Sequence, residues 1–303
     1  MAVAAADKRP FRFGVVAPQA QSAAEWRRIA ARAETLGFST LMLPDTTGSV
    51  LAPFAALGVA AGATSTLRLG NWVLANDLRN PVLVAREAAT LDLLSDGRFE
   101  LGLGAGRGDN DYASFGLEPA SDGVRLRRLG EALHIMRALF AGDRVSFSGK
   151  HYTVVNATLY PPPRKQLPLL IAASGPKAIA QAGQYADTVA IGSRSRDFLS
   201  RQVDWLRAAA GERFASIELA SIAFVVPEGN PAAAQATAAI VKRFGIDLDS
   251  AIAEKAPNLL TGSTSAMIDQ LQERRATFGL SYVVLGVQDA DTCAPLVQRL
   301  AGT

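Results

Sequence analysis

A chain of 303 residues with one cysteine and two histidines can form no internal disulfide, no multi-cysteine metal site and no three-histidine metal site. Its 31 Lys and Arg against 28 Asp and Glu leave a net charge of +3, and the basic residues are scattered, so nucleic-acid binding is not expected. The chain start lacks the apolar run of a signal peptide, and no stretch is long enough to span a bilayer, so we expect a cytoplasmic protein with no membrane contact and no metal.

Short apolar or β-branched runs alternate with helical patterns along the whole chain. Strands are predicted over residues 11–17, 39–43, 67–74, 99–103, 167–172, 188–191, 217–226 and 282–287. Helices are predicted over residues 22–37, 53–63, 81–94, 123–141, 176–185, 197–210, 231–244, 248–255, 263–278 and 290–300. Eight strands, each followed by a helix, is the number that closes a parallel barrel. We therefore predict an α/β fold: a single (β/α)8 TIM barrel domain over residues 1–303, with extra helices.

One segment interrupts the alternation of strands and helices. Residues 145–154 alternate around Gly149 and predict a β-hairpin insertion, with bounds at about residues 143–165. A doubly wound open sheet is the rival fold. It would need a glycine-rich nucleotide fingerprint after the first strand, and residues 16–20 contain no glycine. The barrel is favoured for this reason.

Active sites of such barrels lie at the carboxyl ends of the strands, and polar or glycine residues gather there after the second to sixth predicted strands. The residues at these strand ends include Asp45, Thr46, Ala75, Asn76, Asp77, Gly104, Gly106, Arg107, Ser174, Gly175, Pro176, Lys177, Gly192 and Ser193. By contrast, Pro227 and Glu228, and Gln288 and Asp289, are the plainer ends of the last two predicted strands.

Two of these strand ends suggest close backbone approach or anion binding. Residues 102–108 are rich in glycine, but they fit neither the dinucleotide nor the P-loop spacing, so either a neighbouring helix or a flat ligand could pack there. Residues 174–177 combine a glycine with a proline at a helix start, where free amides can hold an anion; an ordinary capped helix start is the alternative. His134 is expected to be structural, His151 exposed, and Trp72 part of the core.

The chain resembles the luciferase-like superfamily of flavin- and deazaflavin-dependent oxidoreductases, and most closely its subgroup that uses coenzyme F420. The resemblance is carried by stretches spread over the chain, namely residues 33–38, 68–73, 79–81, 88–106 and 173–176. The block from Ala88 to Gly106 is the most specific of them.

The resemblance implies a barrel with an insertion after the fourth helix, a homodimer, and a non-proline cis peptide bond behind the isoalloxazine-like ring, here Trp72–Val73. It implies that Asp45 hydrogen-bonds the polar edge of the ring, with Ala75 and Asn76 adjoining it. The cofactor phosphate would be held by the turns that contain Ser174, Gly175, Pro176, Lys177, Gly192 and Ser193. Gly104, Gly106 and Arg107 would face the ribityl chain and the substrate.

Two departures from the family bear on the chemistry. The glucose-6-phosphate dehydrogenases of this family carry a histidine and a glutamate where this chain has Thr46 and Arg107, so sugar-phosphate oxidation by their route is not expected. Thr46, Asn76 and Arg107 are the candidates for a catalytic role.

We therefore expect an F420-dependent oxidoreductase that moves a hydride to or from a small organic substrate. The alternatives are an FMN-dependent monooxygenase that uses reduced flavin and O2, and a barrel that binds a cofactor without catalysis.

Overall fold

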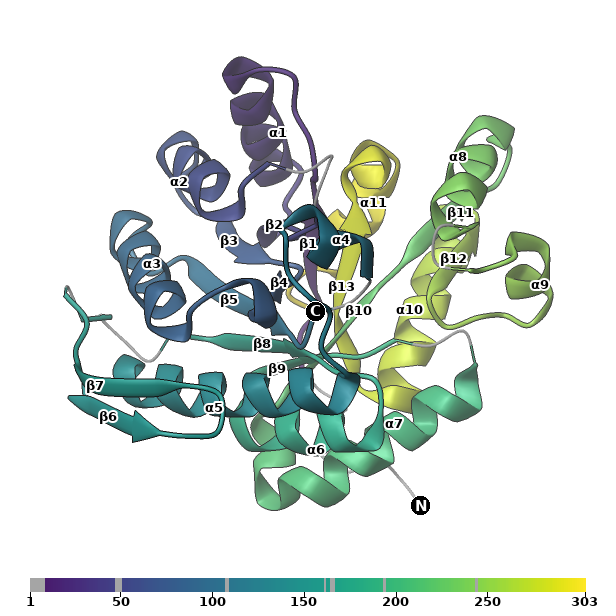
Figure 1. Ribbon diagram of the computed structural model, residues 1–303. Coiled ribbons are helices and arrows are strands. Elements are labelled where there is room, and N and C mark those ends of the chain that lie inside the picture. The colour runs from purple at the N-terminus through teal and green to yellow at the C-terminus, as the bar shows by residue number, and fades with distance from the viewer. Residues whose placement is uncertain are drawn as a thin grey trace.

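The computed structural model describes residues 9–46, 51–106, 109–160, 162–163, 167–192, 195–242 and 245–303. Parallel strands close into a barrel, which Figure 1 views along its axis with helices on the outside. The barrel strands are β1 (Arg12–Val16), β2 (Thr40–Leu43), β3 (Arg68–Asn71), β5 (Phe99–Gly104), β8 (Leu169–Ala172), β9 (Thr188–Ala190), β10 (Glu218–Ile222) and β13 (Leu280–Gly286). Closure comes from the pairing of β1 with β13 and of β3 with β5. The predicted (β/α)8 fold is confirmed.

A helix follows each barrel strand and packs on its outer face. These helices are α1 (Ala23–Thr35), α2 (Pro53–Ala63), α3 (Pro81–Leu94), α5 (Asp122–Phe140), α6 (Pro176–Tyr185), α7 (Arg196–Ala210), α10 (Thr264–Phe278) and α11 (Ala290–Leu300). Local signals set their ends: Ser22 Oγ accepts the amide of Glu25 at 3.1 Å, and Gly279, with φ +77°, ends α10. No helix in the described ranges is long and apolar enough to cross a bilayer.

The barrel strands are buried on both faces, as continuous apolar runs predict. In β2 the side chains of Leu41 and Leu43 belong to the main core between strands and helices, whereas Met42 points into the barrel. There it packs with a second cluster that fills the barrel interior: Leu170, Ala190, Ala220, Tyr282 and Val284. The interior is therefore a packed core rather than a pore.

Charged side chains fill the amino end of the barrel interior. Arg12 donates to Glu218 Oε2 at 2.9 Å and to Glu100 Oε2 at 3.1 Å, and Tyr282 Oη donates to Glu100 Oε1 at 2.7 Å. Burial raises the pKa of the Glu100 carboxyl, but the charges of Arg12 and Arg68 and the Tyr282 hydrogen bond outweigh it, and the pKa lies below its usual value. The carboxylate is thus ionised and paired, as a buried charge must be.

The predicted strand over residues 217–226 is wrong in one respect, because it is two strands. β10 ends at Ile222, and β11 (Phe224–Pro227) leaves the barrel to pair with β12 (Leu259–Gly262), which the sequence analysis does not anticipate. Together with α8 (Pro231–Lys242) and α9 (Leu248–Ala253), this pair encloses a small separate core around Phe224 and Val241. No glycine or proline between Ile217 and Val226 marks the point where the strand changes partner. Because β11 pairs outside the barrel, Pro227 and Glu228 do not end a barrel strand.

The expected hairpin insertion is present at the edge of the molecule beside α5 (Figure 1). It consists of β6 (Val145–Ser148) and β7 (Thr153–Ala157), paired antiparallel. The short helix α4 (Asp109–Ser114) and the 3-10 turns η2 (Asn76–Leu78), η3 (Gly211–Ser216) and η4 (Val287–Asp289) are additional elements that the periodicity does not reveal. Such short elements hold too few residues to show a repeat.

The predicted strand over residues 67–74 is interrupted. β3 stops at Asn71, and the chain resumes as β4 (Leu74–Ala75) after a cis peptide bond between Trp72 and Val73. The expected cis bond is therefore confirmed. β4 pairs with the end of β5, so the interruption forms a bulge at the carboxyl end of the barrel.

Glycines of β5 make room for this bulge. An ideal Cβ on Gly102 would overlap the carbonyl oxygen of Asn71 and lie 3.2 Å from Val73 Cγ1. An ideal Cβ on Gly104 would lie 2.9 Å from Val73 Cγ2. The sequence analysis leaves a helix or a flat ligand as the partner of these glycines, and the partner at both positions is instead the neighbouring strand and its bulge.

A methyl group at residue 102 should therefore disrupt the barrel. We expect Gly102→Ala to lower the free energy of unfolding by about 3 kcal/mol or more, because the overlap is with backbone that cannot rotate away. Gly58→Ala is the matched control: residue 58 lies in α2 with nothing within 4 Å of an added Cβ. Alanine there should be neutral or raise stability by up to about 1 kcal/mol. Urea unfolding of both variants measures the difference, and equal stabilities would contradict the close approach.

Candidate functional site

The carboxyl ends of the barrel strands bring most of the predicted site residues to one mouth. Asp45 and Thr46 follow β2, Ala75 and Asn76 follow the bulge, and Gly104 and Gly106 follow β5. Ser174 to Lys177 and Gly192 follow the adjacent strands β8 and β9. Arg107 and Ser193, which the sequence analysis also names, lie outside the described residues.

The bulge provides an apolar surface at this mouth. Trp72 and Val73 are half-buried, and both pack on the cluster that fills the barrel interior. Val16 and Ala172, which are also half-buried, complete the top of that cluster. Trp72, which the sequence places in the core, thus packs on the core cluster but is only partly buried.

Asp45 is held by partners within the chain. Its carboxylate accepts from Arg79 Nη2 at 2.7 Å and Nε at 3.2 Å, and from the backbone amide of Ala75 at 3.2 Å. Burial lowers the pKa of the Arg79 guanidinium, but the hydrogen bond and charge of Asp45 outweigh it and the pKa is raised. The pair ties the end of β2 to the residues after the bulge. Sequence reasoning gives Arg79 no role in the site.

The turn η2 is fixed from several sides by partners that the sequence analysis does not pair with it. Asn76 is 3% exposed, and its Nδ2 donates to Tyr152 Oη of the hairpin insertion at 3.2 Å. The fully buried Asp77 carboxylate accepts from Arg128 Nη1 of α5 at 2.9 Å and from Tyr112 Oη of α4 at 3.3 Å. The polar residues after the bulge are therefore held by α4, α5 and the hairpin.

Gly106, at the end of β5, has a conformation that favours glycine. Its φ is +85°, and an ideal Cβ would lie 2.6 Å from Tyr112 Oη. A side chain at this position would displace the tyrosine that bonds Asp77. The glycine is thus explained by packing within the chain.

The start of α6 has the features of an anion site. Pro176 is the first helical residue, and no side chain caps the helix. Gly175 has φ −84° and nothing within 4 Å of an ideal Cβ, and Lys177 is exposed beside it. Exposed amides at a helix start, together with a nearby ammonium group, favour a bound anion.

Contacts with α7 and with β9 also position this helix start. The Nε2 of Gln202, a fully buried residue of α7, donates to the carbonyl oxygen of Ser174 at 3.0 Å. The amide of Ala173 donates to Ala190 at 3.0 Å, so the turns after β8 and β9 lie side by side. Gln202 could not be predicted as a site residue, since nothing local to residue 202 shows what it contacts.

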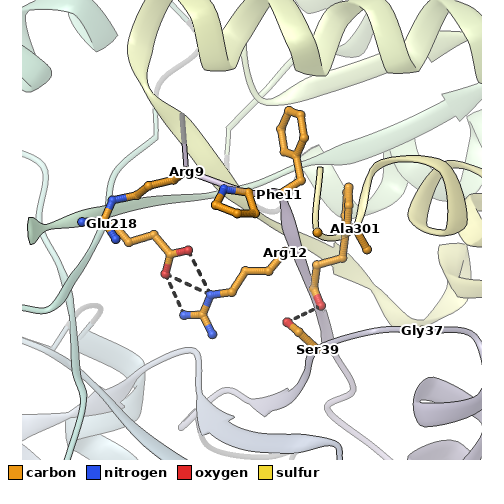
Figure 2. Close-up of a pocket in the computed structure, with 10 residues that line it drawn as sticks. Arg9, Phe11, Arg12, Gly37, Ser39, Glu218 and Ala301 are labelled. Atoms are coloured by element: carbon orange, nitrogen blue, oxygen red, sulfur yellow. Dashed lines mark hydrogen bonds and ion pairs between the residues drawn. The ribbon is translucent and has the colours of Figure 1, made fainter. Parts of the chain in front are cut away.

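A cavity of about 430 Å³ lies at the opposite, amino end of the barrel (Figure 2). Arg9, Arg12, Ser39 and Glu218 line it. The polar groups there bond one another: Arg12 pairs with Glu218, and Ser39 Oγ donates to the carbonyl of Phe13 at 2.9 Å. Catalytic residues of (β/α)8 barrels lie at the other end, so this cavity is not the candidate site.

Neither histidine lies in the mouth by its described contacts. His134 is exposed on α5 with its ring 5.4 Å from that of Phe147. His151 lies in the hairpin loop, where it is half-buried rather than exposed as expected, because its backbone is held by Glu131. The part of the chain that the structure describes contains no cluster of three potential metal-ligating residues. The mouth therefore offers an apolar surface, a polar turn and an uncapped helix start.

Comparisons with known proteins show a matching family and a set of relatives. The family described as "Luciferase-like monooxygenase" matches residues 10–281. Curated relatives include a Beutenbergia cavernae protein named F420-dependent glucose-6-phosphate dehydrogenase, 40% identical over 164 residues, which are 51% of this chain and 48% of that protein. A Microbacterium testaceum protein of the same name is 35% identical over 187 residues, 59% of this chain and 55% of its own. The chain thus spans about half the length of the curated relatives it matches.

Solved structures share the fold over nearly the whole chain. A structure titled F420-dependent secondary alcohol dehydrogenase in complex with an F420-acetone adduct has a TM-score of 0.82 at 23% identity, covering 96% of this chain and 99% of that one. The F420-dependent tetrahydromethanopterin reductase from Methanopyrus kandleri has a TM-score of 0.79 at 20% identity, covering 97% of this chain and 99% of that one. At these identities the likeness establishes the fold.

Proposed function

This chain belongs to the luciferase-like monooxygenase family, and we propose that it is an oxidoreductase that transfers a hydride between coenzyme F420 and an organic substrate. The observation that carries the proposal is that one barrel mouth combines the half-exposed apolar bulge at Trp72 and Val73 with the uncapped, glycine-opened start of α6. A flat ring with a phosphate-bearing tail needs both features. The preference for F420 over FMN rests on the names of the relatives.

The residues present fit such a cofactor. Trp72 and Val73 would support the apolar face of the ring, and the first-turn amides of α6 with Lys177 would hold the phosphate. The open space at Gly175 leaves the amides accessible. Gly192 would contribute to the same phosphate site from the turn after β9. Gly104 and Gly106 would line the tail and the substrate.

The chain's own groups would bind and orient the cofactor and the substrate, and they would exclude water. When bound, the deazaflavin supplies the hydride chemistry that no side chain can supply. Asp45 would meet the polar edge of the ring with a carboxylate whose orientation Arg79 and the Ala75 amide already set. Asn76, fixed by Tyr152, would stand next to that edge. Thr46 is exposed at the end of β2, where it would contact substrate rather than cofactor.

The glucose-6-phosphate dehydrogenases of this family carry a histidine and a glutamate at two positions of the site. This chain has Thr46 and Arg107 at those positions. A threonine hydroxyl and an always-charged guanidinium are poor proton carriers near neutral pH. We therefore propose an organic substrate other than a sugar phosphate.

Titration of the purified protein with F420 and, separately, with FMN tests the proposed cofactor. Following cofactor fluorescence, we expect saturable F420 binding and weaker or no FMN binding. Tight FMN binding without an F420 response would instead favour a flavin monooxygenase. Binding of neither would favour a non-catalytic barrel and contradict the proposal.

Gly175→Val tests the phosphate site separately. The backbone φ of −84° accepts valine and the space is open, so the melting temperature should stay within a few degrees of wild type. The isopropyl group would cover the α6 amides, and we expect F420 affinity to fall at least about tenfold, since one or more charge-assisted hydrogen bonds are lost. An unchanged dissociation constant would show that the phosphate binds elsewhere.

We also propose a homodimer formed through α2 and α3. Helix α2 carries no charged side chain, and its Val59 is 43% exposed; on the neighbouring α3, Leu83 is 57% exposed. Exposed apolar side chains on adjacent helices are typical of an interface. Light scattering should give twice the 31.9 kDa chain mass, and Val59→Asp with Leu83→Asp should give the monomer mass. A wild-type monomer at micromolar concentration would contradict the dimer.

A further inference from the structure

The loop of the hairpin insertion is bound to one carboxylate of the barrel. Glu131 of α5 accepts three successive backbone amides: Lys150 at 2.8 Å, His151 at 2.9 Å and Tyr152 at 2.9 Å. Burial raises the pKa of the Glu131 carboxyl, but these amides outweigh it and the pKa is lowered. An ionised acceptor that takes three donors fixes the loop backbone more firmly than packing alone.

The backbone of the loop fits closely around the Glu131 carboxylate. The amide of Gly149 donates to the carbonyl of Tyr152 at 2.9 Å and closes the turn. An ideal Cβ on Gly149 would overlap Glu131 and the ring of Phe147. The turn therefore wraps closely around the carboxylate, and the residue at its end, Tyr152, has a defined position.

Tyr152 connects the hairpin loop to the candidate site through a hydrogen bond. Its hydroxyl accepts from Asn76 Nδ2 at 3.2 Å, and Asn76 is 97% buried directly after the bulge. Burial raises the pKa of the Tyr152 hydroxyl, so it remains a neutral phenol across the physiological pH range. Because one N–H of the carboxamide is committed to this oxygen, the orientation of the Asn76 side chain is set by the hairpin.

The same turn of α5 holds the neighbouring residue directly. Arg128, three residues before Glu131, pairs with the fully buried carboxylate of Asp77 at 2.9 Å. Helix α5 thus controls η2 by two routes, one direct through Arg128 and one through the hairpin. Consecutive residues of η2 are therefore attached twice to one turn of α5. We infer that this part of the mouth is held rigidly.

We propose that the hairpin insertion is a positioning element of the active site, in which Glu131 holds the loop and Tyr152 orients the Asn76 carboxamide beside the bound cofactor ring. Tyr152 and Glu131 are positioning residues, since they act through Asn76. The placement of the ring rests on the proposed function, whereas the orientation of Asn76 does not. The two parts can therefore be tested separately.

The first test needs no cofactor. In protein labelled with ¹⁵N-asparagine, we expect Tyr152→Phe to shift the Asn76 side-chain amide signals and speed their exchange with solvent. Glu131→Gln should change the Asn76 signals in the same way, indirectly through the hairpin loop. The glutamine carboxamide cannot accept all three loop donors, so the loop is held less firmly. Tyr160→Phe is the matched control, since that hydroxyl belongs to a side chain 89% exposed after β7. Unchanged Asn76 signals in both Tyr152→Phe and Glu131→Gln would overturn the inference.

The second test is a double-mutant cycle on F420 affinity. Tyr152→Phe should raise the dissociation constant about fivefold in the wild-type background, as the loss of one hydrogen bond predicts. In an Asn76→Ala background the same change should have no further effect, because its target is gone. An equal effect in both backgrounds, or none in wild type, would contradict action through Asn76. A wild type that binds no F420 contradicts the proposed function, and the amide signals then decide the positioning of Asn76 alone.

Discussion

The carboxyl end of this barrel depends on the close approach of β5 to the bulge after β3. The backbone of β5 and the carbonyl of Asn71 are so close that no side chain fits at Gly102, and Val73 occupies the space that a side chain at Gly104 would take. This approach places Trp72 and Val73 at the top of the packed interior, where they form the apolar surface of the mouth.

The two ends of the barrel use charge in different ways. At the amino end, Arg12 and Glu100 neutralise each other inside the barrel and close it. At the carboxyl end, Asp45 with Arg79 and Asp77 with Arg128 are also paired, but they attach the residues after the bulge to β2 and to α5. The first network completes the interior, and the second holds the mouth in shape while leaving its apolar surface and the start of α6 open.

The sequence predicts what is local and periodic. The eight strands follow from apolar runs and the helix starts from caps, and the start of α6 follows from the glycine and proline at Gly175 and Pro176. The break in the seventh strand could not be predicted, since no glycine or proline lies between Ile217 and Val226 to mark it. The partners of Asn76 and Asp77 could not be predicted either. Tyr152 lies 76 residues from Asn76 in the sequence, and only folding brings these two side chains together.

We propose that one mouth holds both the ring and the phosphate of a deazaflavin cofactor. A crystal structure of the protein grown with F420 tests this most directly. We expect the ring to lie against Trp72 and Val73, and the phosphate to lie on the first-turn amides of α6 next to Gly175. Cofactor density in the amino-end cavity beside Arg9 and Arg12, or a phosphate remote from α6, would contradict it.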